Sequence, residues 1–427
     1  MLRDVNIIVT RIGRELRQGK ALITFTSIRA LGETLGMVAP LIVAKFFSPG
    51  LFASYSLARM VVFFFSALLI SSSQVPFIIF ANQEKLARGR INKTFSVQLT
   101  FLILSLFLFA AMSLLLGRYI MVFAGINRGD LFFVLLAFVG LAVKTTLCNL
   151  FMALDQRVTN SLAELVFGSA SLALLVTLYL LDRINLRMVF LIHFASSALV
   201  VVLFIRAVDF KLLLPFDLDA QYLRRIFDFT RWVFVGVTAV YFINWGDNLV
   251  LRYFVSMDDI GVYNLGYQLF KGLAILITIL GSYFLPFLSQ NINDRTKMRQ
   301  YLYNKRPRIL VLAFIGIVLV FVAAPYIFRL YSEVYSESVL VLRVLLIAVV
   351  AISYSIFYDP ILNVLKVYKF AQTVNLFQVL LNLLLDVLLV PAMGMLGAAT
   401  ATVLAYLCRA VTIEIYYRVK LKKMLGL

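Results

Sequence analysis

The chain has 427 residues, of which 62% are hydrophobic and only 14% are charged, with a formal net charge of +19. Soluble globular proteins are about 45–50% apolar, and no water-soluble fold has enough interior to bury this excess. The composition therefore excludes a soluble protein and predicts an integral membrane protein. One histidine, His193, and two cysteines in separate apolar runs exclude a disulfide framework and a Cys/His metal site.

Membrane-spanning helices are expected wherever an apolar run reaches roughly 20 residues, which is enough to cross about 30 Å of hydrocarbon. Twelve runs qualify. They cover residues 21–47, 52–80, 95–116, 131–152, 159–181, 188–205, 231–255, 260–288, 309–331, 339–365, 371–390 and 394–417. An even number of spans places both termini on the same side of the membrane.

The distribution of Lys and Arg identifies that side. The termini and the loops on their side carry 27 basic residues, and the opposite loops carry 7. The positive-inside rule therefore predicts that both termini are cytoplasmic. Residues 1–20 mix Ile and Leu with Arg, which predicts an amphipathic helix on the inner surface and no cleavable signal. Because most of the excess charge lies in these loops, it reflects topology and attraction to lipid, and nucleic acid is not an expected partner.

The two halves of the chain resemble each other. Lys45-Phe46-Phe47 followed by Tyr55-Ser56-Leu57-Ala58 recurs as Arg252-Tyr253-Phe254 followed by Tyr263-Asn264-Leu265-Gly266. A repeat displaced by six spans keeps its orientation, so we expect two parallel-repeat six-helix bundles around a central cleft. The predicted parts are the amphipathic helix at 1–20, bundles at 21–207 and 229–418, a cytoplasmic linker at 208–228 and a basic tail at 419–427.

Ionisable residues inside the predicted spans are the main functional signal. A charge at the centre of a membrane helix costs on the order of 2.5–3.5 kcal/mol, so it has to face protein or water. The first span carries polar and small residues at spacings of three and four, which place them on one helix face: Arg29, Glu33, Gly36 and Pro40. Two interpretations stay open: Arg29 and Glu33 form a structural ion pair, or Arg29 faces a substrate cleft.

Later spans carry further polar stripes, among them Tyr263, Tyr267 and Lys271 at i,i+4 spacing. Interhelical hydrogen bonding is the alternative role for their neutral members. The residues expected to bind substrate are Arg29, Arg59, Lys144, Lys271, Tyr241, Asn244, Asn248 and Tyr267. If transport is coupled to an ion, the candidate carboxylates are Glu33, Asp247, Asp359 and Asp386.

No phosphate-binding glycine loop, HExxH or GxSxG motif occurs in the sequence, so we expect no catalytic residues, no cofactor and no enzyme. The residues alone predict a transporter with a water-filled, partly cationic cleft. They do not identify its cargo.

Two stretches, one in each half, carry a family resemblance. They are AKFFSPGLFASYSLARMVVFFFSALL, which continues to ANQEKLARGRINK, and INWGDNLVLRYFVSMDDIGVYNLGYQLFKG. With them the chain resembles the oligosaccharide and polysaccharide flippases of bacterial inner membranes, of the O-antigen flippase type. Their superfamily also contains multidrug extruders and the peptidoglycan-precursor flippase, and the latter usually has two helices more than this chain.

The resemblance implies a flippase for undecaprenyl-diphosphate-linked oligosaccharides in the synthesis of a surface polysaccharide such as lipopolysaccharide O-antigen. It implies transport by alternating access, with a polysaccharide polymerase and a chain-length regulator as partners and membrane lipid as solvent. Coupling to H⁺ or Na⁺ stays open. The alternatives are a cation-coupled multidrug extruder of the same superfamily and a polytopic lipid-linked sugar polymerase or glycosyltransferase.

Overall fold

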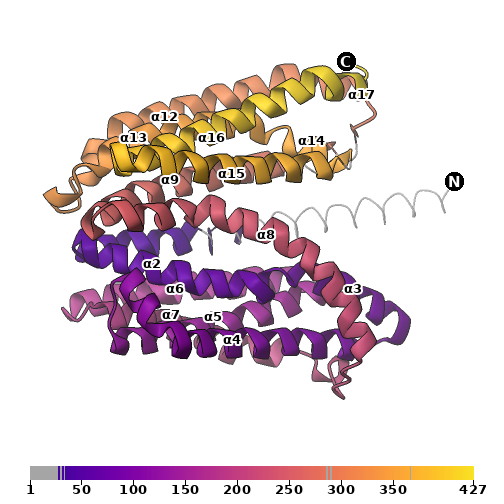
Figure 1. Ribbon diagram of the computed structural model, residues 1–427. Coiled ribbons are helices and arrows are strands. Elements are labelled where there is room, and N and C mark those ends of the chain that lie inside the picture. The colour runs from indigo at the N-terminus through magenta and orange to yellow at the C-terminus, as the bar shows by residue number, and fades with distance from the viewer. Residues whose placement is uncertain (1–26, 29–30, 33, 285–286, 289–290, 366) are drawn as a thin grey trace. The chain divides into compact units, whose positions relative to one another are not determined.

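The computed structural model describes residues 27–28, 31–32, 34–284, 287–288, 291–365 and 367–427 (Figure 1). Within these ranges every regular element is a helix and no strand occurs. The predicted amphipathic helix at residues 1–20 lies outside the described residues, as do Arg29 and Glu33.

The labelled α-helices are α2 (Pro49–Ser66), α3 (Gln74–Arg88), α4 (Asn92–Ala124), α5 (Arg128–Ala153), α6 (Arg157–Leu180), α7 (Leu186–Phe204), α8 (Ala220–Phe254), α9 (Met257–Tyr283), α11 (Arg295–Gln300), α12 (Arg306–Phe328), α13 (Ser338–Ile356), α14 (Asp359–Val364), α15 (Tyr368–Met393), α16 (Met395–Tyr416) and α17 (Lys422–Met424). Short π-helical turns continue several of them: η1 (Ala67–Ser71) follows α2, η4 (Tyr301–Lys305) joins α11 to α12, and η6 (Tyr417–Leu421) joins α16 to α17.

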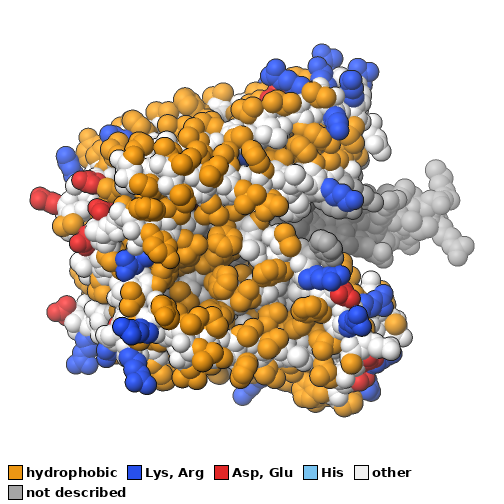
Figure 2. Space-filling view, in the orientation of Figure 1, with side chains coloured by type: hydrophobic (Ala, Val, Ile, Leu, Met, Phe, Trp, Pro, Cys, Tyr) orange, Lys and Arg blue, Asp and Glu red, His pale blue; other side chains and the backbone are white. Residues whose placement is uncertain are grey.

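The described residues contain eleven helical segments that are long and apolar enough to cross a membrane. A shorter apolar helix, Thr34–Phe46, lies within the first predicted span. Each of the twelve predicted spans overlaps one of these segments, which confirms an all-α integral membrane protein. Figure 2 shows hydrophobic side chains along the helices and Lys and Arg gathered near the helix ends, as a lipid-facing surface requires.

By its contacts the chain divides into two compact units. The first comprises residues 1–40, 65–117 and 128–234, and the second comprises residues 41–64, 118–127 and 235–427. Most of α2 therefore packs with the C-terminal helices. The predicted bundles at 21–207 and 229–418 are delimited from the sequence duplication and not from contacts, so they differ from these units. Their boundaries stay a prediction.

In the first unit, the segment between α7 and α8 is held against the start of α4. The Ile91 N–H donates to the Leu212 carbonyl at 2.9 Å, and Lys93 Nζ lies 2.7 Å from Asp219 Oδ2. Hydrogen bonds from Lys93 and from the Tyr222 N–H lower the pKa of Asp219. The part of the predicted linker before α8 is thus anchored to this unit.

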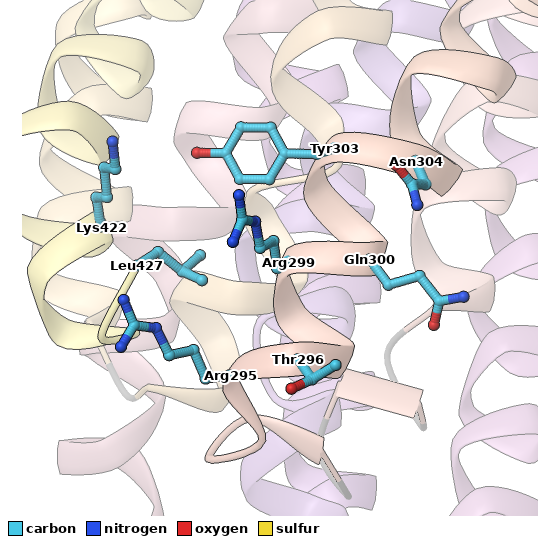
Figure 3. A pocket seen from close by; sticks show the side chains of 8 residues that line it. All are labelled: Arg295, Thr296, Arg299, Gln300, Tyr303, Asn304, Lys422 and Leu427. Atoms are coloured by element: carbon cyan, nitrogen blue, oxygen red, sulfur yellow. The ribbon is translucent and has the colours of Figure 1, made fainter.

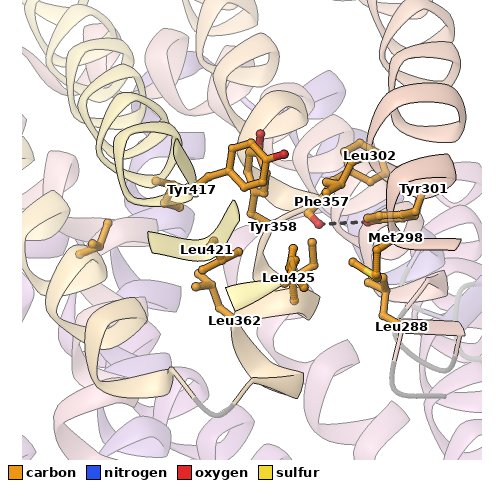
Figure 4. Packing of buried hydrophobic residues seen from close by; sticks show 13 residues of the cluster. Leu288, Met298, Tyr301, Leu302, Phe357, Tyr358, Leu362, Tyr417, Leu421 and Leu425 are labelled. Carbon is orange, nitrogen blue, oxygen red and sulfur yellow. Dashed lines mark hydrogen bonds between the residues drawn. The ribbon is translucent and has the colours of Figure 1, made fainter. Parts of the chain in front are cut away.

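In the second unit, a buried cluster joins the helices at one end of the bundle (Figure 4). Met298, Tyr301 and Leu302 from α11 and η4 pack with Leu421 and Leu425 from the η6–α17 end of the chain. The Tyr301 hydroxyl donates to the carbonyl of Phe357 at 3.0 Å, which satisfies a buried polar group. Because α11, η4 and the η6–α17 segment are anchored in this cluster, the positions of their exposed side chains are also defined.

A tight turn places α15 beside α16. Gly394 has a φ of +57°, a conformation that glycine adopts without the steric cost of a side chain. Three residues later, a Cβ on Gly397 would lie 2.5 Å from the Leu389 carbonyl oxygen, so the two helices approach closely here. The turn brings Asp386 and Thr402, each eight residues from Gly394, into one buried site.

Candidate functional site

Most of the described residues predicted to bind substrate lie in the second unit. Arg59 lies on α2, Tyr241, Asn244 and Asn248 lie on α8, and Tyr267 and Lys271 lie on α9. Lys144 lies on α5 in the first unit. The second unit contains two sites, each formed entirely by its own residues.

The first site, the cation–aromatic cluster, consists of Arg59, Phe63, Trp245 and Lys271. Arg59 Cζ lies 5.5 Å from the centroid of the Phe63 ring, and Lys271 Nζ lies 5.3 Å from the centroid of the Trp245 ring. The two rings stack with their centroids 5.8 Å apart. Two cations therefore flank one aromatic pair, and each cation–π contact contributes about 0.5–2 kcal/mol to their placement.

Neither cation of this cluster has an ion-pair partner in the described part of the chain. Both side chains are partly exposed. Arg59 also lies over the ring of Tyr55, with 5.2 Å from its Cζ to the ring centroid. A guanidinium and an ammonium group at aromatic faces can donate charge-assisted hydrogen bonds to an anion from outside the chain.

Two other cations inside the membrane helices are neutralised by carboxylates. Lys144 Nζ lies 2.7 Å from Glu164 Oε2 on α6, and its side chain is only 5% exposed. Arg409 on α16 lies 2.9 Å from Asp359 Oδ2 on α14. The predicted role of Lys144 in substrate binding and that of Asp359 in ion coupling stay predictions, but both charges already have partners within the protein.

The neutral residues predicted to bind substrate all make hydrogen bonds within the protein. Tyr241 donates to the Met60 carbonyl (3.1 Å), Tyr267 to the Ile243 carbonyl (3.1 Å) and Asn244 to the Val240 carbonyl (2.7 Å), and Asn248 accepts from Asn264 (2.8 Å). Three of these bonds join different helices, α8 with α2 or with α9. They hold Trp245 and Lys271 in register, in line with the interhelical role considered for such stripes.

The second site, the carboxyl cluster, contains Asp247, Tyr263, Asn382, Asp386 and Thr402. The Asn382 amide donates to both carboxyl groups, at 3.3 Å to Asp247 Oδ1 and 3.1 Å to Asp386 Oδ2. Asp247 Oδ2 also accepts from the hydroxyls of Thr402, at 2.9 Å, and Tyr263. Asp247 and Asp386 are 3% and 0% exposed, and the described residues offer neither of them a Lys or Arg partner.

Two buried carboxyl groups that share one amide and have no basic partner cannot both be ionised without a large free-energy cost. A bound proton or a small cation removes that cost. Asp386 Oδ1 is buried and has no hydrogen-bond partner in the described part of the chain, so the cluster retains an oxygen that could accept a further bond. Of the predicted ion-coupling residues, Asp247 and Asp386 are thus brought together, whereas Asp359 is placed elsewhere.

Sequence reasoning did not single out Phe63, Trp245, Glu164 or Arg409 as site residues. For Phe63 a signal was present, because Tyr55, Arg59 and Phe63 follow strict i,i+4 spacing on one helix. For Glu164 and Arg409 no signal was available, since their partners lie on other helices and a single sequence does not reveal contacts between helices.

The family model for polysaccharide biosynthesis proteins matches residues 42–340, which is more than half of the chain. The chain belongs to this polysaccharide biosynthesis family. No curated protein sequence matches it. This membership agrees with the resemblance to polysaccharide flippases. The all-helical fold alone does not distinguish such flippases from other transporters.

Solved structures place this family member in a wider fold group. The lipid II flippase MurJ in an inward closed conformation is 15% identical with a TM-score of 0.76, covering 93% of this chain and 87% of MurJ. An inward-facing multidrug resistance MATE transporter of the MOP superfamily is 13% identical with a TM-score of 0.71, covering 95% and 98% of the two chains. A MOP superfamily transporter from Pyrococcus furiosus, described as having a binding pocket of reverse polarity, is 14% identical with a TM-score of 0.58 and 96% coverage of both chains.

These likenesses confirm the two-repeat transporter fold. The chain is a multi-pass membrane protein of a polysaccharide biosynthesis family, and it shares its fold with the flippase and the two transporters named above.

Proposed function

We propose that this protein is a flippase that moves undecaprenyl-diphosphate-linked oligosaccharide units from the cytoplasmic to the periplasmic leaflet by alternating access. A diphosphate carrying sugars cannot cross about 30 Å of hydrocarbon unaided. The polyprenyl tail stays in lipid while the protein shields the polar head. The product feeds the synthesis of a surface polysaccharide of the O-antigen or capsule kind.

The observation that carries this proposal is the cation–aromatic cluster. Arg59 and Lys271 lie in the membrane helices without a described carboxylate partner and flank the stacked rings of Phe63 and Trp245. Arg and Lys form charge-assisted hydrogen bonds with phosphate oxygens, and aromatic faces pack against sugar rings. One cluster therefore offers partners for both parts of a lipid-linked sugar diphosphate.

The carboxyl cluster is the proposed site of H⁺ or Na⁺ coupling. Asp247 and Asp386 are buried together, and loading one positive charge would relieve their repulsion. An inside-negative potential of 100 mV already favours the export of two negative charges by about 4.6 kcal/mol. The ion would then bias the return of the empty protein.

A multidrug extruder of the same superfamily is the main alternative. Lipophilic cations require accessible carboxylates or aromatic faces without competing positive charge. Here the carboxyl cluster is almost fully buried, and the partly exposed intramembrane groups around Trp245 are cations. The charges around the aromatic pair therefore favour an anionic cargo.

The test measures flipping in proteoliposomes. A polyprenyl-diphosphate disaccharide carrying an NBD fluorophore is quenched by external dithionite only when it reaches the outer leaflet. The double variant R59Q/K271Q removes two charge-assisted contacts worth about 1.5–3 kcal/mol each. We expect the flipping rate to fall at least a hundredfold, and K271R to keep part of the activity because it retains the charge.

The matched control is R343Q. Arg343 also lies in a membrane helix, but it lies over the Phe321 ring and donates to the Phe321 carbonyl, away from the cluster. R343Q removes a similar charge and should flip at close to the wild-type rate. Normal flipping by R59Q/K271Q, or wild-type transport of ethidium in the same vesicles without any flipping, would overturn the proposal.

A further inference from the structure

A basic cavity of about 830 Å³ lies at one end of the second unit, apart from both sites described above (Figure 3). Three cations line it: Arg295 and Arg299 from α11, and Lys422 from α17. Thr296, Gln300 and Tyr303 add neutral hydrogen-bonding groups. Among the residues that the structure describes, no Asp or Glu side chain lines the cavity.

The helical segments that carry these cations are anchored by buried side chains on their opposite faces. Met298 and Tyr301, which alternate with Arg295 and Arg299 along the same turns, are fully buried in the cluster of Figure 4. Leu421 and Leu425, on either side of Lys422, are buried in that same cluster. The cations therefore project from two segments that share one core, so their spacing is built into the fold.

The three cations of the cavity lack ion-pair partners among the residues that the structure describes. Among the neighbouring cations, Lys297 lies 3.6 Å from Asp294 and Arg418 lies 2.6 Å from Glu414, whereas Lys420 and Lys423 have no ion pair among the described residues and do not line the cavity. The positive-inside rule explains why basic residues gather at this end of the helices. It does not explain why three unpaired cations and several neutral donors converge on one cavity.

We propose that this cavity binds the phosphate group of an anionic membrane lipid. The cavity lies at the end of the unit where the apolar stretch of α12 begins and that of α16 ends, on the side predicted to be cytoplasmic. Three cations match a phosphomonoester or diphosphate, which carries about two negative charges, better than a phosphodiester, which carries one. Basic pockets at the inner ends of membrane helices bind such headgroups. The site does not depend on the cargo proposed for the cation–aromatic cluster.

The experiment is native mass spectrometry of the purified full chain, titrated with phosphatidic acid, with phosphatidylcholine or with inorganic pyrophosphate. The wild type is expected to retain phosphatidic acid in preference to phosphatidylcholine. R299Q should weaken this binding about tenfold, and R295Q/R299Q/K422Q at least a hundredfold, because each cation supplies a charge-assisted hydrogen bond. The matched control is K85Q/R88Q/R90Q, which removes three exposed cations from the predicted cytoplasmic loop of the first unit.

Selective loss in the cavity variant, with the control unchanged, supports the site. An equal loss in both triple variants would reduce the effect to diffuse charge and overturn it, as would unchanged binding in R299Q and in the cavity variant. Pyrophosphate that binds as tightly as phosphatidic acid would show that the ligand is a soluble phosphate compound, which overturns the assignment to lipid. Flipping in the dithionite assay should persist in the cavity variant, which separates this test from that of the transport site.

Discussion

The ion pair between Lys144 and Glu164 allows a decisive separation of structural from substrate-binding charge. Lys144 Nζ lies 2.7 Å from Glu164 Oε2 and 4.3 Å from the centroid of the Phe167 ring. The side chains are exposed to different extents, 5% for Lys144 and 35% for Glu164. Removing Glu164 therefore leaves an unpaired buried ammonium, whereas removing Lys144 leaves an unpaired carboxylate that is about one-third exposed.

The expected magnitudes follow from this asymmetry. Removing one partner of a buried ion pair costs about 3–5 kcal/mol of folding free energy when the other partner remains charged and buried. E164Q leaves Lys144 in this state and should be severely destabilised. K144M should cost about 1–3 kcal/mol, because the remaining carboxylate is one-third exposed. The double variant K144M/E164Q leaves no stranded charge and should recover most of the loss.

The assay is thermal unfolding of the four proteins in one detergent. With an unfolding entropy of about 2.1 cal/mol/K per residue, a 427-residue chain that unfolds as one unit loses roughly 3–6 °C in Tm for 3–5 kcal/mol. Melting of E164Q at the wild-type temperature, or a double variant no more stable than E164Q, would contradict a buried structural ion pair between Lys144 and Glu164. The dithionite assay then decides the function: a stable double variant that still flips its cargo removes Lys144 from the substrate-binding residues.

Three further predictions concern packing, the linker and ion coupling. G261A should lower Tm by several degrees, because the new Cβ would lie 1.9 Å from the Pro49 carbonyl oxygen, whereas G316A, with nothing within 4 Å of its Cβ, should not. Because the pKa of Asp219 is lowered from its ordinary 3.8, the ion pair between Asp219 and Lys93 should persist as the pH falls from 7 to 5 and weaken only below pH 3.8. The variant K93M, which lacks this pair, should show faster hydrogen exchange in residues 209–219 at every pH. D247N/D386N should abolish any dependence of flipping on a proton or sodium gradient while the protein remains folded, and a gradient dependence equal to that of the wild type would contradict the assignment of the carboxyl cluster.

The fold was largely predictable because membrane insertion leaves a strong one-dimensional record. A run of about 20 apolar residues has few alternatives to a spanning helix, and all twelve predicted spans overlap helices. The sites were predictable only as far as a single helix reveals them. The spacing of Tyr263, Tyr267 and Lys271 correctly places three side chains on one face of α9. It carries no information on which residues of other helices they meet, so the contacts with Asp247 and Trp245 required the structure.

That face of α9 connects the two sites in a way that bears on coupling. Tyr263 donates to Asp247 in the carboxyl cluster, and its ring stacks on Tyr267 with 5.7 Å between centroids. One turn further, Lys271 meets the ring of Trp245 in the cation–aromatic cluster. Asp247 and Trp245 are themselves two residues apart on α8. Because both sites share α8 and α9, a movement of α8 against α9 on ion loading at Asp247 would also change the distance between Trp245 and Lys271. The proposed coupling between ion and cargo would therefore need no long pathway through the protein.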